Sequence, residues 1–96
     1  MMAYIIITSS AFATRKEIQD YLDSIKEVQY WYACLPDCVF CTSSLMADEL
    51  AQKLRARFGR ERFLVMECND NRQGWLPRAA WHLMRHPDSP MLDGDS

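Results

Sequence analysis

Apolar and polar positions along the chain follow the two periods of strands and helices, and the strands come first. Tyr4–Ile7 is a short, almost continuous apolar run, which is typical of a central strand buried on both faces. Aromatic and β-branched residues fill both arms of Val28–Ser44 around Pro36 and Asp37, which predicts a hairpin with a tight turn. Phe63–Met66 predicts a fourth strand, ending near Cys68.

A helical period follows the first predicted strand. Thr14 and Glu17 have the spacing of a capping box, in which each side chain satisfies a backbone amide of the first turn. Apolar residues then recur at helical spacing, which predicts a helix of about three turns with one buried stripe. This stripe consists of Ile18, Tyr21, Leu22 and Ile25.

Two further helices are predicted after the hairpin. Ser43 and Ser44 are candidate N-caps of a helix that ends at Gly59, and its apolar stripe is Ala47, Leu50, Leu54 and Phe58. A last helix begins at Pro77 and stops at Pro87. Its predicted apolar side is Ala80, Trp81 and Met84.

The predicted order is strand, helix, strand, strand, helix, strand. This order is typical of the ferredoxin-like βαββαβ fold, an α+β architecture with an antiparallel sheet and both helices on one face. The last helix adds to that six-element core. We therefore expect a single domain over residues 1–87 and a disordered acidic tail over residues 88–96.

Composition narrows the functional classes. The 96 residues are 49% hydrophobic and 25% charged, as in ordinary globular domains. No apolar run approaches the roughly 20 residues that span a bilayer, and the first residues lack a basic signal-peptide region, so we expect a cytoplasmic protein without a membrane partner. The net charge of −2 argues against a strongly basic nucleic-acid binder.

Basic residues nevertheless concentrate in the second half of the chain. The candidate nucleic-acid-binding residues are Arg55, Arg57, Arg60 and Arg62, at the end of the second predicted helix and just after it. The alternative interpretation is a solvated helix surface with its flanking loop, because cations are also favoured near helix C-termini.

The spacing of the cysteines matches known metal-binding motifs, but the predicted strands argue against a metal site. Cys34, Cys38 and Cys41 have the spacing of a radical S-adenosylmethionine cluster site, and the last two match redox and zinc pairs. Cys38 and Cys41 are three apart on a predicted strand and so point to opposite faces, which argues against a shared metal or cofactor site, and we predict no metal and no cofactor. No catalytic residue is predicted either. Metal binding by these three cysteines with Cys68 stays open. His82 and His86 share a helix face, and a dipole-stabilising role is preferred for them.

Aromatic residues are the candidate partner or dimer interface. On an open sheet face they could stack bases, as in RNA-binding modules, or cover a protein partner. A dimer mate is the preferred partner for a net-acidic chain. The candidate residues are Tyr30, Trp31, Tyr32, Trp75 and Trp81.

The chain resembles the small SinR-like proteins. The motifs that carry the resemblance are a YIII-type first strand, a W-x-x-C-L hairpin from Trp31, a second-helix start around Ala47–Leu50, and N-x-Q-G-W-L-P-x-x-A-W from Asn71 to Trp81. The group is related in fold to the small CRISPR adaptation subunit and to VapD-like ribonucleases. The resemblance implies a ferredoxin-like homodimer. Nuclease relatives place an Asp at the end of the first strand, where this chain has Ser9, so no catalytic residue is transferred.

These observations lead to three functional hypotheses, of which nucleic-acid binding through Arg55, Arg57, Arg60 and Arg62 is the third. The first is a non-enzymatic homodimeric module that scaffolds a protein or nucleic-acid assembly, in a CRISPR-like or toxin–antitoxin-like defence setting. The alternative is a metal-dependent endoribonuclease, whose candidate acidic residues are Asp37, Glu67 and Asp70.

Overall fold

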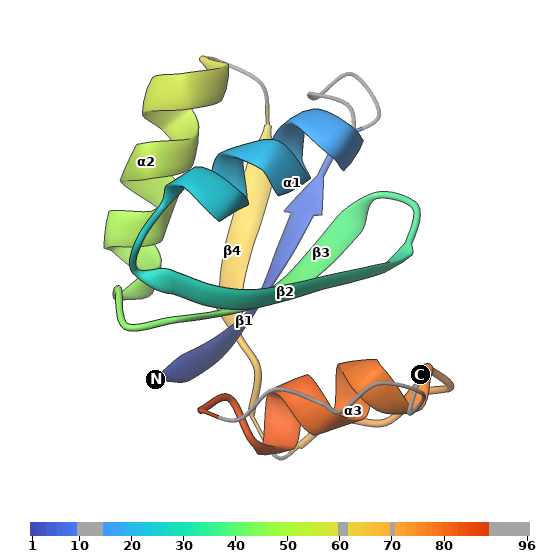
Figure 1. The fold of residues 1–96 in the computed structure, drawn as a ribbon. Coiled ribbons are helices and arrows are strands. Elements are labelled where there is room, and N and C mark those ends of the chain that lie inside the picture. Colours follow the sequence, from blue (N-terminus) through green and yellow to red (C-terminus); the bar gives the residue numbers. More distant parts are fainter. Residues whose placement is uncertain (10–14, 60–61, 70, 89–96) are drawn as a thin grey trace.

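Four strands and three helices make up the described part of the chain, which comprises residues 1–9, 15–59, 62–69 and 71–88 of a computed structural model (Figure 1). In chain order these elements are β1 (Met2–Thr8), α1 (Arg15–Ser24), β2 (Val28–Leu35), β3 (Cys38–Ser43), α2 (Ala47–Phe58), β4 (Phe63–Glu67) and α3 (Arg78–Arg85).

The four strands form one antiparallel sheet in the order β2-β3-β1-β4. The predicted hairpin is confirmed, with Pro36 and Asp37 at the turn between β2 and β3. The predicted α+β class is also confirmed, because a four-stranded antiparallel sheet packs with three helices.

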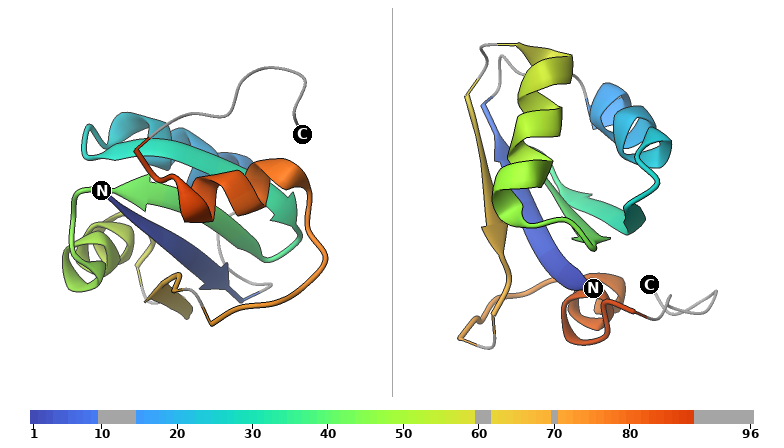
Figure 2. Two further views of the ribbon diagram at one scale, coloured as in Figure 1. Left: turned by 90° about the horizontal axis from the view of Figure 1, so that it is seen from below. Right: turned by 90° about the vertical axis from the view of Figure 1, so that its left-hand side faces the viewer.

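One face of the sheet carries α1 and α2 (Figure 2). Tyr4 and Ile6 of β1 point to this face, since alternate residues of a strand share a side. They pack against the stripes of both helices, where Leu22, Leu50 and Leu54 are fully buried. The helical periods seen in the sequence therefore gave the correct buried faces of α1 and α2.

The other face of the sheet carries α3, whose Ala80 and Leu83 are buried against Ala3 and Phe40. The predicted apolar side of α3 is correct for Ala80 and Met84 but wrong in omitting Leu83, which lies one helical turn beyond Ala80 on the same side. Trp81 is only half-buried. The sheet thus has a hydrophobic core on both sides, as the apolar run of β1 indicates.

The start of α2 differs from the prediction. Ser43 is buried at the end of β3, and its Oγ accepts a 3.0 Å hydrogen bond from the amide of Leu45. The N-cap is Met46 instead, and the Glu49 carboxylate accepts a 2.9 Å hydrogen bond from the backbone amide of Met46. The Gly59 stop is confirmed, with φ of 76° and its amide bonded to the carbonyl of Arg55. The predicted Thr14 cap lies outside the described residues.

Edge strand β2 pairs irregularly with β3 at two places. Val28 faces Ser43 while Tyr30 faces Thr42, so β2 holds one extra residue, and a second extra residue lies between Tyr32 and Leu35. Each β-bulge switches the face to which the following residues point. Val28 consequently packs with α1 and α2, whereas Tyr30 and Tyr32 pack under α3.

The helices are short. The longest, α2, has 12 residues, and no helix in the described ranges is long and apolar enough to span a bilayer. At the end of the described chain, the Asp88 carboxylate lies 3.5 Å from the amino terminus at Met1. The remainder of the predicted acidic tail, residues 89–96, lies outside the described residues.

Candidate functional site

Side chains on the α3 face of the sheet form three rows that run across the strands. The inner row, Ala3, Thr42 and Tyr30, is covered by α3. The middle row comprises Tyr32, Phe40, Ile5 and Met66. We call the third set the outer row, which comprises Leu35, Cys38, Ile7 and Leu64.

The outer row is apolar and largely uncovered. Ile7 and Leu35 are each 39% exposed and Leu64 is 49% exposed, whereas Ala3 in the inner row is 4% exposed. None of the outer-row residues packs in the cluster around Ala80 and Leu83. Single exposed hydrophobic residues are common, but a row that crosses all four strands is a contiguous apolar patch.

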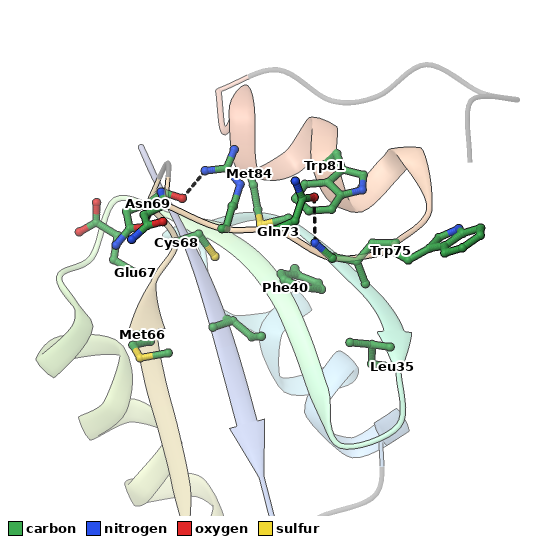
Figure 3. A pocket seen from close by; sticks show the side chains of 15 residues that line it. Leu35, Phe40, Met66, Glu67, Cys68, Asn69, Gln73, Trp75, Trp81 and Met84 are labelled. Atoms are coloured by element: carbon green, nitrogen blue, oxygen red, sulfur yellow. Dashed lines mark hydrogen bonds between the residues drawn. The ribbon is translucent and has the colours of Figure 1, made fainter.

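Beside the outer row, a pocket of about 620 Å³ lies between the sheet and the segment that leads into α3 (Figure 3). Ile5, Phe40 and Met66 contribute its sheet side, while Leu76, Trp81 and Met84 contribute the α3 side. Its polar lining comprises Glu67 at the end of β4 and, from the intervening segment, Asn69, Asn71, Arg72 and Gln73.

Local hydrogen bonds shape that polar segment. The Asn69 side-chain oxygen accepts a 2.9 Å bond from the amide of Asn71, which makes an Asx turn. The guanidinium of Arg72 donates a hydrogen bond to the Asn69 carbonyl. The side-chain oxygen of Gln73 accepts a 3.0 Å hydrogen bond from the amide of Gly74. These contacts hold Arg72 beside the cavity that it lines.

A second pocket of about 370 Å³ adjoins the first. It is lined by Arg72, Gln73, Gly74, Trp81 and Arg85, and all of these except Arg85 also line the larger pocket. The two pockets therefore share one wall, with two arginines at the smaller one and an apolar surface at the larger one.

The five predicted interface aromatics do not form one surface. Trp31 packs on the α1 and α2 side, where its indole nitrogen donates a 2.6 Å hydrogen bond to Asp23. Tyr30 and Tyr32 pack in the cluster under α3. Trp75 and Trp81 line the larger pocket, and Trp75, at 98% exposed, points out from it into solvent (Figure 3).

The candidate nucleic-acid residues stand around the C-terminal end of α2. Arg55, Arg57 and Arg62 are exposed, and Arg60 lies outside the described residues. The Arg55 guanidinium carbon is 5.9 Å from the centre of the Phe63 ring, and that of Arg57 is 4.9 Å from the centre of the Phe58 ring. Such cation–π contacts cover apolar rings while the charges stay at the surface.

The four cysteines form no disulfide. Cys38 belongs to the outer row, while Cys41 pairs with Tyr4 and is buried on the other face, as the strand period predicts. Burial raises the pKa of the Cys41 thiol to about 12. Burial also raises the pKa of Cys68, against the opposing effect of the nearby Arg72. Both thiols therefore stay protonated at neutral pH, where a thiol is a weak nucleophile.

Candidate metal ligands are scattered. Among the described residues, no three His, Cys, Asp or Glu side chains gather in a way that could hold a metal ion. The rings of His82 and His86 lie 5.1 Å apart between centroids.

The acidic residues of the nuclease hypothesis lie apart. Asp37 is beside the end of β1, since its carbonyl accepts the amide of Thr8 at 2.8 Å. Glu67 pairs with Tyr4 at the far end of the same ladder, about 13 Å away at the rise of a strand. Asp70 lies outside the described residues. At Ser9, the amide donates to the carbonyl of Arg62 at 3.2 Å.

Comparisons with protein-family models, with curated proteins and with solved structures find no match to this chain. The residues themselves therefore carry the functional assignment. Sequence reasoning missed the outer row and the pair Arg72 and Arg85. Strand alternation was the available signal for the row, but alternation gives the face of a residue and not what covers it.

Proposed function

We propose that this chain is a non-enzymatic homodimeric binding module, and that a second copy covers the outer row of its sheet. The observation that carries the proposal is the outer row itself, in which every strand presents an apolar side chain and three of these are more than one-third exposed. Burying that surface is favourable by about 25 cal/mol for each Å² of apolar area removed from water.

A second copy is the occupant that the chemistry favours. The outer row carries no charge, so two copies related by a two-fold axis could meet without burying an unpaired ion. A specific interface needs about 800 Å² from each partner. The outer row and the adjacent Met66, which is 49% exposed, would form the apolar centre of such an interface, with Trp75 beside it.

The wider context of the proposal is a ferredoxin-like βαββαβ fold of the SinR-like type. Two observations support that context: β1 lies in the middle of the sheet, and α1 and α2 pack on the same face of it. In this context the dimer would serve as a scaffold for a protein or nucleic-acid assembly.

Sedimentation velocity from low to high micromolar concentration tests the dimer. We expect the wild-type chain to sediment as a dimer, and the double variant Ile7→Gln/Leu64→Gln to sediment as a monomer with an unchanged circular dichroism spectrum. Met46→Gln is the matched control, because Met46 is 55% exposed at the start of α2 and outside the outer row. A wild-type monomer across that range would refute the dimer, and equal dimerisation of both variants would refute the assignment to the outer row.

A further inference from the structure

The two adjoining pockets differ in chemistry in a way that matches one class of ligand. The smaller pocket presents two guanidinium groups, from Arg72 and Arg85. The larger pocket presents mainly apolar side chains, including Ile5, Phe40 and Met84. A molecule that lies across the shared wall would therefore place one end beside positive charge and the rest against apolar surface.

We propose that this composite pocket binds a small amphiphilic carboxylate. The carboxylate would pair with Arg85 and Arg72, and the apolar body would occupy the 620 Å³ cavity. Guanidinium groups bind carboxylates through two parallel hydrogen bonds, which gives the head group a defined place. This inference concerns a ligand site and goes beyond the proposed dimer.

The distribution of charge supports an anion. Residues 68–86 hold three arginines and a single acidic residue, Asp70. Glu67 also borders the larger pocket, but it pairs with Tyr4, whose side chain is buried on the α1 and α2 face. Figure 3 accordingly shows the Glu67 carboxylate directed away from the cavity. Among the described residues, Arg85 forms no ion pair that would already neutralise it.

The size and lining of the larger pocket support an apolar body. Ligand pockets of about 300–1,000 Å³ are typically apolar with a few convergent polar groups. Here most of the apolar groups come from the sheet, from α3 and from Leu76 just before it, and the polar groups come from the segment between β4 and α3 and from Glu67 at the end of β4. The cavity is thus formed by parts of the chain that are distant in sequence.

Isothermal titration calorimetry with three ten-carbon probes tests the ligand class. Decanoate, decanol and decyltrimethylammonium share one apolar chain and differ in the charge of the head group. We expect decanoate to bind at least about tenfold more tightly than the other two, which corresponds to about 1.4 kcal/mol. Equal binding of decanol, or tighter binding of the cation, would overturn the proposal.

Variants locate the head group. Arg85→Gln should weaken decanoate binding by about tenfold or more, a loss of about 1.4 kcal/mol that the removal of one charged hydrogen-bond partner readily supplies. Arg78→Gln is the matched control, because Arg78 is exposed on the same helix and lines neither pocket. Equal losses in the two variants would overturn the assignment to this site.

Indole resonances provide a second readout within the same protein. Decanoate should shift the indole signal of Trp81, which lines both pockets, and leave that of Trp31 on the opposite face unchanged. A dominant shift of Trp31 would overturn the site.

The dimer variant separates this proposal from the dimer. Ile7→Gln/Leu64→Gln alters no residue that lines either of the two pockets, so the variant should still bind decanoate as a monomer. Loss of decanoate binding in that variant would place the ligand on the outer row instead, and would refute the pocket.

Discussion

The hydroxyl of Tyr4 donates a 2.7 Å hydrogen bond to the carbonyl oxygen of Leu45, 41 residues further along the chain. This bond ties central strand β1 to the turn from which α2 begins. Tyr4 is 1% exposed, and burial, with a further contribution from Glu67, raises the pKa of its hydroxyl. The bond thus satisfies a polar group inside the larger core.

Tyr4→Phe should lower the free energy of unfolding by about 0.5–1.5 kcal/mol, because the partly buried hydrogen bond to the Leu45 carbonyl is lost. Urea unfolding followed by circular dichroism measures the loss. Tyr21→Phe is the matched control, since Tyr21 donates a similar 2.9 Å bond to the carbonyl of Lys53 but is half-exposed. The control should lose less, and a larger loss in the control than in Tyr4→Phe would contradict this account.

Cys41 should make the chain less stable in alkali. Its pKa is raised from 9.0 to about 12 in the folded chain, chiefly by burial. Above pH 9 the unfolded chain releases this proton while the folded chain retains it, so the free energy of unfolding falls as the pH rises, by up to about 1.4 kcal/mol per pH unit. Below pH 9 the contribution is constant.

Denaturant unfolding of wild type and Cys41→Ala across the alkaline range isolates that effect. The variant should show a shallower decline above pH 9, whatever its stability at neutral pH. Two parallel profiles would show that Cys41 does not titrate in this way.

Overpacking at Ala80 should displace α3. Ala80 is fully buried against the sheet in the cluster that includes Ala3, so a larger side chain has no room there. Ala80→Leu should cost about 1–3 kcal/mol, whereas Ala79→Leu, on the half-buried neighbour, should cost less. Thermal unfolding compares the two variants, and equal costs would argue against close packing of α3.

Replacement of a leucine by alanine should cost much more stability in the core than on the outer row. Leu54 is fully buried between α2 and the sheet, and Leu54→Ala should cost about 2–5 kcal/mol by leaving a cavity. Leu64→Ala removes an exposed side chain of the outer row and should leave the stability of the monomer within about 0.5 kcal/mol of wild type. The unfolding measurements should be made at low protein concentration, where the chain is monomeric, so that a change in dimerisation does not affect the measured stability.

Local patterns in the sequence were sufficient for the elements of this fold. The proline turn, the helical stripes of α1 and α2, and the Gly59 stop each depend on neighbouring residues, and each was predicted. The N-cap of α2 was predicted wrongly because Ser43 is the last residue of β3 and pairs with Met2 of β1. Pairing with a strand that is distant in sequence cannot be seen in a local pattern.

The candidate site was less predictable than the fold. Trp75 and Trp81 were proposed as interface residues from their type, and both line the larger pocket. The pairing of Arg72 with Arg85 was not foreseen, because it depends on how the segment before α3 returns across the sheet.

Ala3, Ile5 and Ile7 show where the sequence ceased to be informative. Their alternation alone places all three on one face of β1, since successive residues of a strand point to opposite sides. Only the tertiary structure decided that Ala3 is 4% exposed and Ile7 is 39% exposed. The physical reason is that burial depends on which distant element packs over a residue, and α3 covers the inner row while leaving the outer row open.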